Sequence, residues 1–187
     1  MMTNSTYRNY VSILKELNMH QEELALYNFG KINNLIINAN HIFLLGAGRS
    51  GCVMKMFANR LNHLGLNVSI IGEVTAPPAN KNDVLILNSS SGATDRLIVT
   101  AKKAKKIGVT IILISSQTNT ELYKLADEAI IFSANSKSSA DNSLSRQPMG
   151  SLFEQTSLII CDAIVISLKE MLEETNQTMS KRHANLE

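Results

Sequence analysis

The sequence predicts an α/β fold, a three-layer α/β/α sandwich around a five-stranded parallel sheet of flavodoxin-like order 2-1-3-4-5. Three observations predict it. Short apolar runs alternate with segments of helical periodicity between residues 41 and 132. The short runs are apolar throughout, as strands are when helices cover both faces of their sheet. The segments between them are long enough for the helical crossovers that parallel strands require.

The N-terminal part is expected to consist of two helices. Apolar side chains recur at helical spacing over Tyr7–Tyr27 and again, with Ile32, Leu35 and Ile36 on one face, over Phe29–Asn38. Each helix leaves a second apolar face beyond the one that packs on the sheet. We therefore expect these helices to take part in oligomerisation.

The predicted strands and the helices between them follow in strict alternation. Each strand is a short apolar run bounded by turn residues. The strands are His41–Leu45, Val68–Ile71, Asp83–Leu87, Val109–Ile114 and Glu128–Phe132. The helices are Ser50–Leu64, Thr94–Ile107, Thr120–Ala126 and Gly150–Glu173. Gly65 and Gly108 close two of these helices, as C-terminal glycines commonly do. The Ser- and Asn-rich stretch Ser133–Ser145 is interpreted as a loop or lid, and Asn176–Glu187 as a polar tail with helical character.

Length and composition indicate a single domain over residues 1–187, with N-terminal helices over 5–39, a sheet core over 41–132 and C-terminal helices over 150–187. Apolar residues make up 44% of the chain and charged residues 18%, which is typical of a globular protein. The formal net charge is +2, and the lysines at 102, 103, 105 and 106 are interpreted as a solvated helix face. We therefore expect no nucleic-acid partner.

The cysteines and the apolar runs indicate a cytoplasmic protein without a membrane partner. Cys52 and Cys161 lie far apart in apolar surroundings, which excludes a zinc cluster and argues against a disulfide. The N-terminus lacks the basic and apolar regions of a secretory signal. The longest apolar run, around Leu158–Leu168, is too short for a membrane span and contains Asp162, which we interpret as an intersubunit or capping contact.

Two unusual loops are expected at the carboxyl ends of the first and third strands, which are neighbours in the predicted sheet. They read Gly46-Ala47-Gly48-Arg49-Ser50-Gly51 and Asn88-Ser89-Ser90-Ser91-Gly92-Ala93-Thr94. Ligands of open α/β sheets bind at this edge. Hydroxyls together with free backbone N–H groups at a helix N-terminus form an anion site. The second loop therefore predicts phosphate binding, with simple capping of the helix by one hydroxyl as the alternative.

The first loop also fits G-x-G-x-x-G, the dinucleotide-binding pattern. Glu73 ends the second strand, where a Rossmann fold places its ribose-binding acid. An NAD-dependent oxidoreductase is thus an alternative function. The second, hydroxyl-rich loop and the lack of room for a substrate domain argue against it.

Four segments together resemble the sugar isomerase (SIS) domain family: GAGRSG, NSSSGAT, PMGSLFEQT and the terminal RHANLE. Within that superfamily the chain is most similar to the 6-phospho-3-hexuloisomerases, and the resemblance covers nearly the whole chain. It implies interconversion of D-arabino-hex-3-ulose 6-phosphate and D-fructose 6-phosphate in the ribulose monophosphate route of formaldehyde fixation. It also implies a homotetramer that uses no metal and no nucleotide cofactor.

The resemblance assigns the substrate phosphate to the second loop, with the first loop facing it. The matched substrate- and phosphate-binding residues are Gly48, Arg49, Ser50, Ser89, Ser91 and Thr94. The family's second loop reads S-G-S-G-E-T, whereas this chain has Ser90 for the first Gly and Ala93 for the Glu. Ser90 strains the turn if its φ is positive, and Ala93 cannot do what the Glu does. A non-catalytic phosphosugar-binding or sensing protein is therefore a second alternative.

Moving a carbonyl between C3 and C2 requires a base that takes a carbon-bound proton and passes through an enediol. A carboxylate in a partly dry cleft suits this task, because desolvation raises its pKa. Glu154, in the first turn of the last long helix, matches the family's base, although an acid there also complements the helix dipole. Glu73 is a candidate for holding sugar hydroxyls.

The four histidines are interpreted differently from one another. On the sequence alone His183 is a solvated tail residue, but the resemblance implies that it reaches a site of a neighbouring subunit to open the sugar ring or move protons. His63 is interpreted as a packing residue at a helix end, and His41 as a structural residue at a strand start. His20 is expected on the surface of a helix, without a role.

Overall fold

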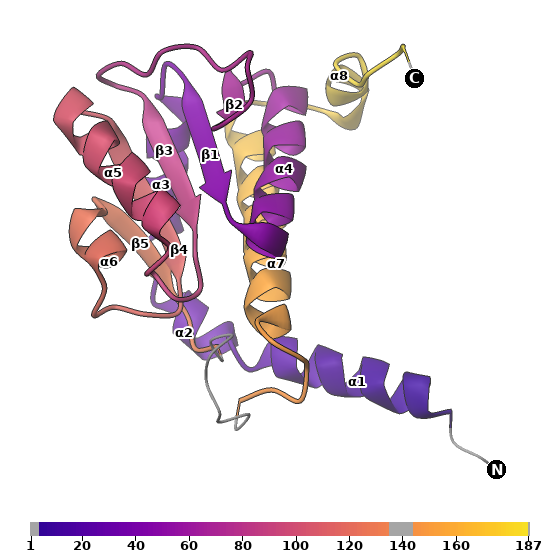
Figure 1. The fold of residues 1–187 in the computed structure, drawn as a ribbon. Coiled ribbons are helices and arrows are strands. Elements are labelled where there is room, and N and C mark those ends of the chain that lie inside the picture. The colour runs from indigo at the N-terminus through magenta and orange to yellow at the C-terminus, as the bar shows by residue number, and fades with distance from the viewer. Residues whose placement is uncertain (1–3, 135–143, 187) are drawn as a thin grey trace.

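The computed structural model of the chain describes residues 4–134 and 144–186 (Figure 1). Within these residues five parallel strands form one sheet in the order β2-β1-β3-β4-β5, which confirms the predicted topology. The strands are β1 (Ile42–Gly46), β2 (Val68–Ile70), β3 (Val84–Asn88), β4 (Thr110–Ser115) and β5 (Glu128–Ile131). Gly46 of β1 pairs with Asn88 of β3, so the two predicted ligand loops leave the sheet side by side.

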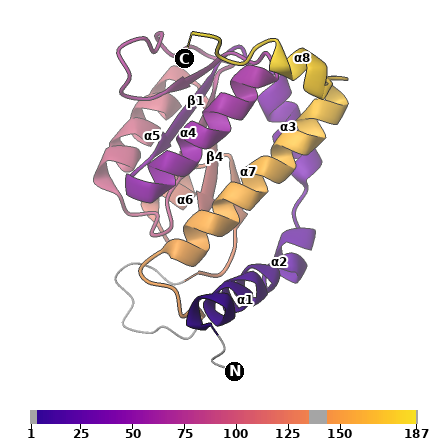
Figure 2. The same ribbon diagram turned by 90° about the vertical axis from the view of Figure 1, so that its right-hand side faces the viewer.

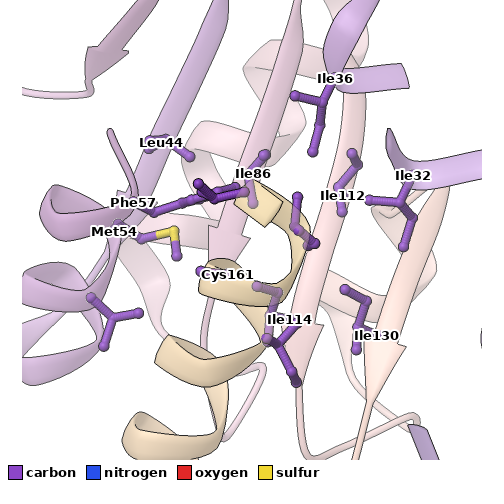
Figure 3. Close-up of a cluster of buried hydrophobic side chains, with 14 of the residues drawn as sticks. Ile32, Ile36, Leu44, Met54, Phe57, Ile86, Ile112, Ile114, Ile130 and Cys161 are labelled. Carbon is purple, nitrogen blue, oxygen red and sulfur yellow. The ribbon is translucent and has the colours of Figure 1, made fainter. Parts of the chain in front are cut away.

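Helices cover both faces of the sheet because alternate side chains of each strand point to opposite faces. In β1, Ile42 and Leu44 join one buried cluster, whereas Phe43 and Leu45 join the other. The first cluster lies under α3 (Phe29–Ile37), α4 (Gly48–His63) and α7 (Ser151–Met171), and Figure 3 shows its centre. The second lies under α5 (Asp95–Ile107) and α6 (Glu121–Leu125). The three-layer sandwich is thereby confirmed.

The predicted helices differ from the observed ones chiefly at their ends. Helix α4 begins at Gly48, two residues earlier than the predicted start at Ser50, so most of the first loop is the first turn of a helix. The polar tail contains one short helix, α8 (Asn176–Ser180). Of the predicted loop Ser133–Ser145, the residues 135–143 lie outside the described residues.

The prediction of one helix over Tyr7–Tyr27 is wrong, because the chain forms α1 (Ser5–Asn18) and α2 (Gln21–Ala25) with a break at Met19 and His20. His20 is 3% exposed, and its ring packs edge-on against Phe132 at 5.3 Å between centroids. The expectation of a surface histidine is therefore also wrong. A contact with a residue so distant in sequence leaves no periodic signal in the helix itself.

Helix α7 is long and apolar enough to cross a membrane by length and composition, with a mean hydropathy of 1.5 over an 18-residue window. It is nevertheless a core helix of this fold, because 56% of that window is buried and it lies beside α4 on one face of the sheet (Figure 2). Asp162 is exposed on this helix rather than buried within it. Of the cysteines, Cys161 is buried in the core as expected, whereas Cys52 is exposed.

Candidate functional site

A cavity of about 290 Å³ opens at the carboxyl edge of the sheet, between the ends of β1 and β3. Its walls come from both predicted ligand loops. They are Ala47, Ser50, Asn88, Ser89, Ser90, Ser91 and Thr94. All four hydroxyl residues that the sequence matched to phosphate binding therefore face one space, which we call the serine cavity.

Glycines allow the first loop to turn sharply from β1 into α4. A Cβ on Gly46 would lie 2.7 Å from the carbonyl carbon of Ser50, so only a glycine permits this approach of strand and helix. Gly48 has a φ of +56°, in the left-handed region that favours glycine. As a result α4 starts immediately at the cavity, with Ser50 (6% exposed) in its first turn. The helix N-terminus and its partial positive charge lie at the cavity wall.

The second ligand loop, residues 88–94, which we call the serine loop, is held in place by hydrogen bonds to the end of β4 and to Ser116. Ser89 N donates to Ile114 O at 3.0 Å, and Ser90 O accepts from Ser116 N at 3.2 Å and from Ser115 Oγ at 3.2 Å. Among the described residues, left-handed φ values occur at Asn82, Met149 and Glu173 and at glycines, and Ser90 is outside that set. The condition under which Ser90 would strain the turn is therefore not met.

The hydroxyls of the serine loop group together at the start of α5. Thr94 is the N-cap of α5, but its hydroxyl makes no capping bond to the described helix backbone and lies 3.5 Å from Ser89 Oγ. Ser91 Oγ accepts a hydrogen bond from the backbone N–H of Ala93 at 3.3 Å. Simple capping thus does not account for these hydroxyls, and an anionic group in the cavity would meet them together with the N-terminus of α5.

Asn88 is a residue of this site to which the sequence analysis gave no role. It is fully buried, and its Nδ2 donates to Ser50 O at 3.4 Å while its Oδ1 accepts from Ser157 Oγ at 3.2 Å. The amide thereby joins β3, α4 and α7 behind the cavity. The signal in the sequence was a polar residue that ends an otherwise apolar strand, since a buried amide requires partners.

Arg49 and Glu154 form an ion pair between the first turns of α4 and α7. The Glu154 side chain is 4% exposed, whereas that of Arg49 is 67% exposed. The hydrogen bond and the charge of Glu154 raise the pKa of Arg49 above its usual range. Ser157, one turn further along α7 than Glu154, contacts Asn88. Through Ser157 and Asn88, α7 is linked to the wall of the serine cavity, but neither Glu154 nor Arg49 is among the residues that line that cavity.

Glu73 occupies a neighbouring cavity rather than the serine cavity. This second space, of about 230 Å³, lies at the ends of β1 and β2 and is also lined by Lys55 and Arg96. Gly46 and Gly51 of the first loop line it as well. Glu73 is exposed there, so the first loop separates the two cavities and Glu73 stands apart from the predicted phosphate site.

His183 lies at the opposite end of α4 from Arg49. Its ring stacks on His63 with centroids 5.2 Å apart, and the neighbouring Arg182 donates to His63 O at 2.9 Å. Since α4 has 16 residues, its two ends are about 24 Å apart. Figure 1 shows α8 and the C-terminus at the far end of the molecule from α1. Within one chain the structure therefore does not bring His183 to the other predicted site residues.

The remaining titratable groups of the described residues add no metal site. Within 4–134 and 144–186, no group of three or more His, Cys, Asp or Glu side chains has the arrangement of metal ligands. His41 Nε2 lies 3.0 Å from Ser69 Oγ across two strands, and His63 is buried at the end of α4. Both fit the structural interpretation that the sequence favoured.

This fold and site define a class of protein. The SIS domain family matches residues 35–162, and the chain belongs to that family. A Bacillus subtilis protein named 3-hexulose-6-phosphate isomerase is 38% identical over 94% of this chain and 95% of its own. A crystal structure from Methanococcus jannaschii, from which a 3-hexulose-6-phosphate isomerase function was inferred, has a TM-score of 0.83 at 31% identity and covers 96% of this chain and 99% of that one.

A more distant structure shares the fold alone. It is that of the Vibrio vulnificus NanR protein complexed with ManNAc-6P, with a TM-score of 0.76 at 20% identity, and it covers 96% of this chain and 67% of that one.

Proposed function

We propose that the protein is a phosphosugar isomerase that interconverts D-arabino-hex-3-ulose 6-phosphate and D-fructose 6-phosphate. The observation that carries this proposal is the serine cavity, which is lined by five hydroxyl residues at the starts of two helices, together with the buried carboxylate of Glu154 in the first turn of α7. Relatives that span most of the chain and are named for this reaction support it. The near-neutral net charge of +2 is compatible with an anionic substrate, because hydroxyls and helix N-termini hold the phosphate locally.

In the proposed reaction, Ser50, Ser89, Ser91 and Thr94 hold the phosphate, and Arg49 contacts the sugar. Glu154 takes the proton from C2 of the 3-ketose, and the electron pair forms the C2–C3 double bond of a 2,3-enediol while O3 gains a proton. Return of a proton to C3 and loss of the proton on O2 give the 2-ketose. No redox partner is needed, because C2 is oxidised as C3 is reduced. A positioned carboxylate of this kind acts as a general base.

We further propose that His183 completes the site of a neighbouring subunit in a homo-oligomer, with a tetramer as the expected form. Its distance from Arg49 in its own chain favours this arrangement over an intrachain role. Exposed apolar side chains supply contact surface, among them Ile159 (51%) and Ile166 (60%) on α7. The ribulose monophosphate route and a cytoplasmic location are part of the same proposal, on the strength of the family resemblance.

A second function, a non-catalytic phosphosugar sensor, is favoured by one specific residue. Ala93 stands at the exposed start of α5 where the family pattern has a glutamate. If that glutamate is needed for chemistry, the serine cavity binds phosphosugars but does not turn them over.

The experiment that separates these functions is incubation of the purified protein with 3-hexulose 6-phosphate, with fructose 6-phosphate measured as product. Turnover supports the isomerase. Phosphosugar binding without turnover supports the sensor. A thermal-shift screen with NAD and NADP in parallel tests the oxidoreductase, which predicts stabilisation by a nucleotide and none by phosphosugars.

A further inference from the structure

A polar stripe runs along the inner side of the N-terminal arm, which we define as residues 5–27. Its members are Glu16 in α1, His20 in the break between α1 and α2, Glu23 in α2 and Tyr27 just after α2. Tyr27 contacts Ile131, the last residue of β5, and the other three contact the chain between β5 and α7. The stripe therefore joins the arm to both sides of the connection that leads to Glu154.

On the β5 side, two side chains hold the end of the strand. Tyr27 Oη donates to Ile131 O at 2.7 Å and accepts from Ile131 N at 3.0 Å, as a neighbouring strand would. Glu23 accepts from Ser133 N at 2.9 Å and from Ser133 Oγ at 2.5 Å. These bonds fix the chain just before the connection begins.

On the α7 side, the single buried carboxylate of Glu16 holds the chain just before the helix begins. Glu16 is 8% exposed and accepts from Ser145 Oγ at 2.7 Å, Arg146 N at 3.2 Å and Gln147 Nε2 at 3.0 Å. Burial alone would raise the pKa of Glu16, but these hydrogen bonds lower it below its usual value. The residues it holds lead directly into α7, where Ser151 Oγ donates to Pro148 O at 2.8 Å.

Aromatic rings form a parallel path from the arm to the same turn of α7. The ring of His20 meets the ring of Phe132 edge-on, and Phe132 stacks on Phe153 with centroids 5.2 Å apart and an interplanar angle of 14°. Phe153 is fully buried and directly precedes Glu154. Rings packed in this way leave little freedom to the backbone at Glu154.

We propose that Glu16 is a positioning residue for Glu154: by holding Ser145–Gln147 it fixes where α7 begins and so aims the carboxylate of the base. The inference rests on the proposed function, since it takes Glu154 as that base. A cavity of about 330 Å³ lies between α1 and Arg146–Pro148, so hydrogen bonds rather than close packing join the two at this point. The serine cavity is built from other elements, the ends of β1 and β3 and the starts of α4 and α5.

The test compares Glu16→Gln with Glu22→Gln, which removes the same charge from an exposed position on α2. Glu16→Gln is expected to lower kcat by about tenfold to a hundredfold, because small misplacement of a reacting group has effects of that size. Its Kd for fructose 6-phosphate is expected to stay within about twofold of wild type, since the phosphate site is intact. Glu22→Gln is expected to change neither quantity.

Hydrogen exchange supplies a measurement that needs no activity. Amides of residues 145–154 are expected to exchange faster in Glu16→Gln than in Glu22→Gln or in wild type. Ser145→Ala, which removes one partner at less cost to folding, is expected to have a smaller effect in the same direction. The double variant is expected to lose less than the product of the two single losses in kcat, because both changes break one contact.

The outcomes separate this inference from the proposed function. A wild-type protein without turnover contradicts the isomerase, while faster exchange at residues 151–154 in Glu16→Gln still supports the positioning role. Unchanged exchange in that variant overturns the role. An active wild type with faster exchange but undiminished kcat in Glu16→Gln overturns it as well.

Discussion

At the scale of single residues, the proposed site depends on two paired side chains that are 105 positions apart in sequence, Arg49 and Glu154. Each begins a helix that covers the same face of the sheet, so the fold brings them together at the carboxyl edge. The guanidinium fixes the direction of a carboxylate that is otherwise enclosed. In the proposed reaction this held carboxylate takes a proton from a phosphosugar bound in the serine cavity, which requires that the carboxylate and the sugar be oriented precisely.

Replacement of Glu154 by Gln is expected to abolish turnover, because the amide cannot take a proton from carbon. Fructose 6-phosphate affinity is expected to remain within about tenfold, or ~1.4 kcal/mol, since the phosphate contacts remain. Steady-state kinetics and calorimetric binding measure the two effects. Glu170→Gln, an exposed carboxylate on the same helix, is the matched control. Near-normal turnover in Glu154→Gln removes it as the base.

The double variant Ser89→Ala, Ser91→Ala is expected to weaken phosphosugar binding. Hydrogen bonds to a charged group contribute about 1.5–3 kcal/mol each, so a loss of at least about tenfold in affinity is expected. Isothermal titration measures it, with Ser167→Ala on α7 as the control. Unchanged affinity would refute the phosphate role of the serine loop.

At the scale of elements, the sequence predicted every strand and their order, because buried parallel strands are short, apolar and separated by helices. It also predicted four of the hydroxyls that line the serine cavity. Three features could not be predicted in the same way. They are the break between α1 and α2, the hydrogen bonds of Asn88 to α4 and α7, and the hydrogen bonds of Glu16 to the chain before α7. Each depends on polar or aromatic contacts with residues more than 35 positions away, which leave no local pattern.

The contact of the C-terminal tail with His63 predicts that the stability of this end of the molecule depends on pH. Burial, Arg60 and His183 lower its pKa from the ordinary value of 6.5. A histidine whose folded-state pKa is depressed stabilises the fold above its unfolded pKa, and that contribution is lost as pH falls through the folded value. The contact of Arg182 and His183 with the end of α4 is therefore expected to weaken below pH 6.5.

The variant His183→Ala tests this account directly. It removes a like charge and part of the cover over His63, so the pKa of His63 is expected to rise toward its ordinary value. Titration of the His63 ring by NMR measures the change, with His41→Ala as a control at a distant strand. An unchanged or lower pKa would contradict the role given to the His63–His183 stack.

At the scale of the whole molecule, the serine cavity and the tail histidine lie at opposite ends of α4, so the proposed site, with His183 included, requires two chains. Exposed apolar residues on α7 and on α1, such as Ile159, Ile166, Tyr7 and Tyr10, provide surfaces for such an assembly. Shared sites have a consequence that intrachain sites lack: two inactive variants can complement each other.

Glu154→Gln and His183→Ala are each expected to be inactive alone. When the two variants are unfolded, mixed and refolded together, mixed oligomers are expected to regain part of the wild-type turnover, because some sites combine Glu154 of one chain with His183 of the other. The same treatment of each variant alone is the control. A mixture as inactive as its components would show that the site is not shared in this way.

The most direct test of the central claim is the reaction of 3-hexulose 6-phosphate with the purified protein in D₂O, followed by NMR. An enediol mechanism predicts fructose 6-phosphate that carries solvent deuterium at C3, formed by wild type and not by Glu154→Gln. Bound phosphosugar that is never converted, or deuterated product formed equally well by Glu154→Gln, would contradict it.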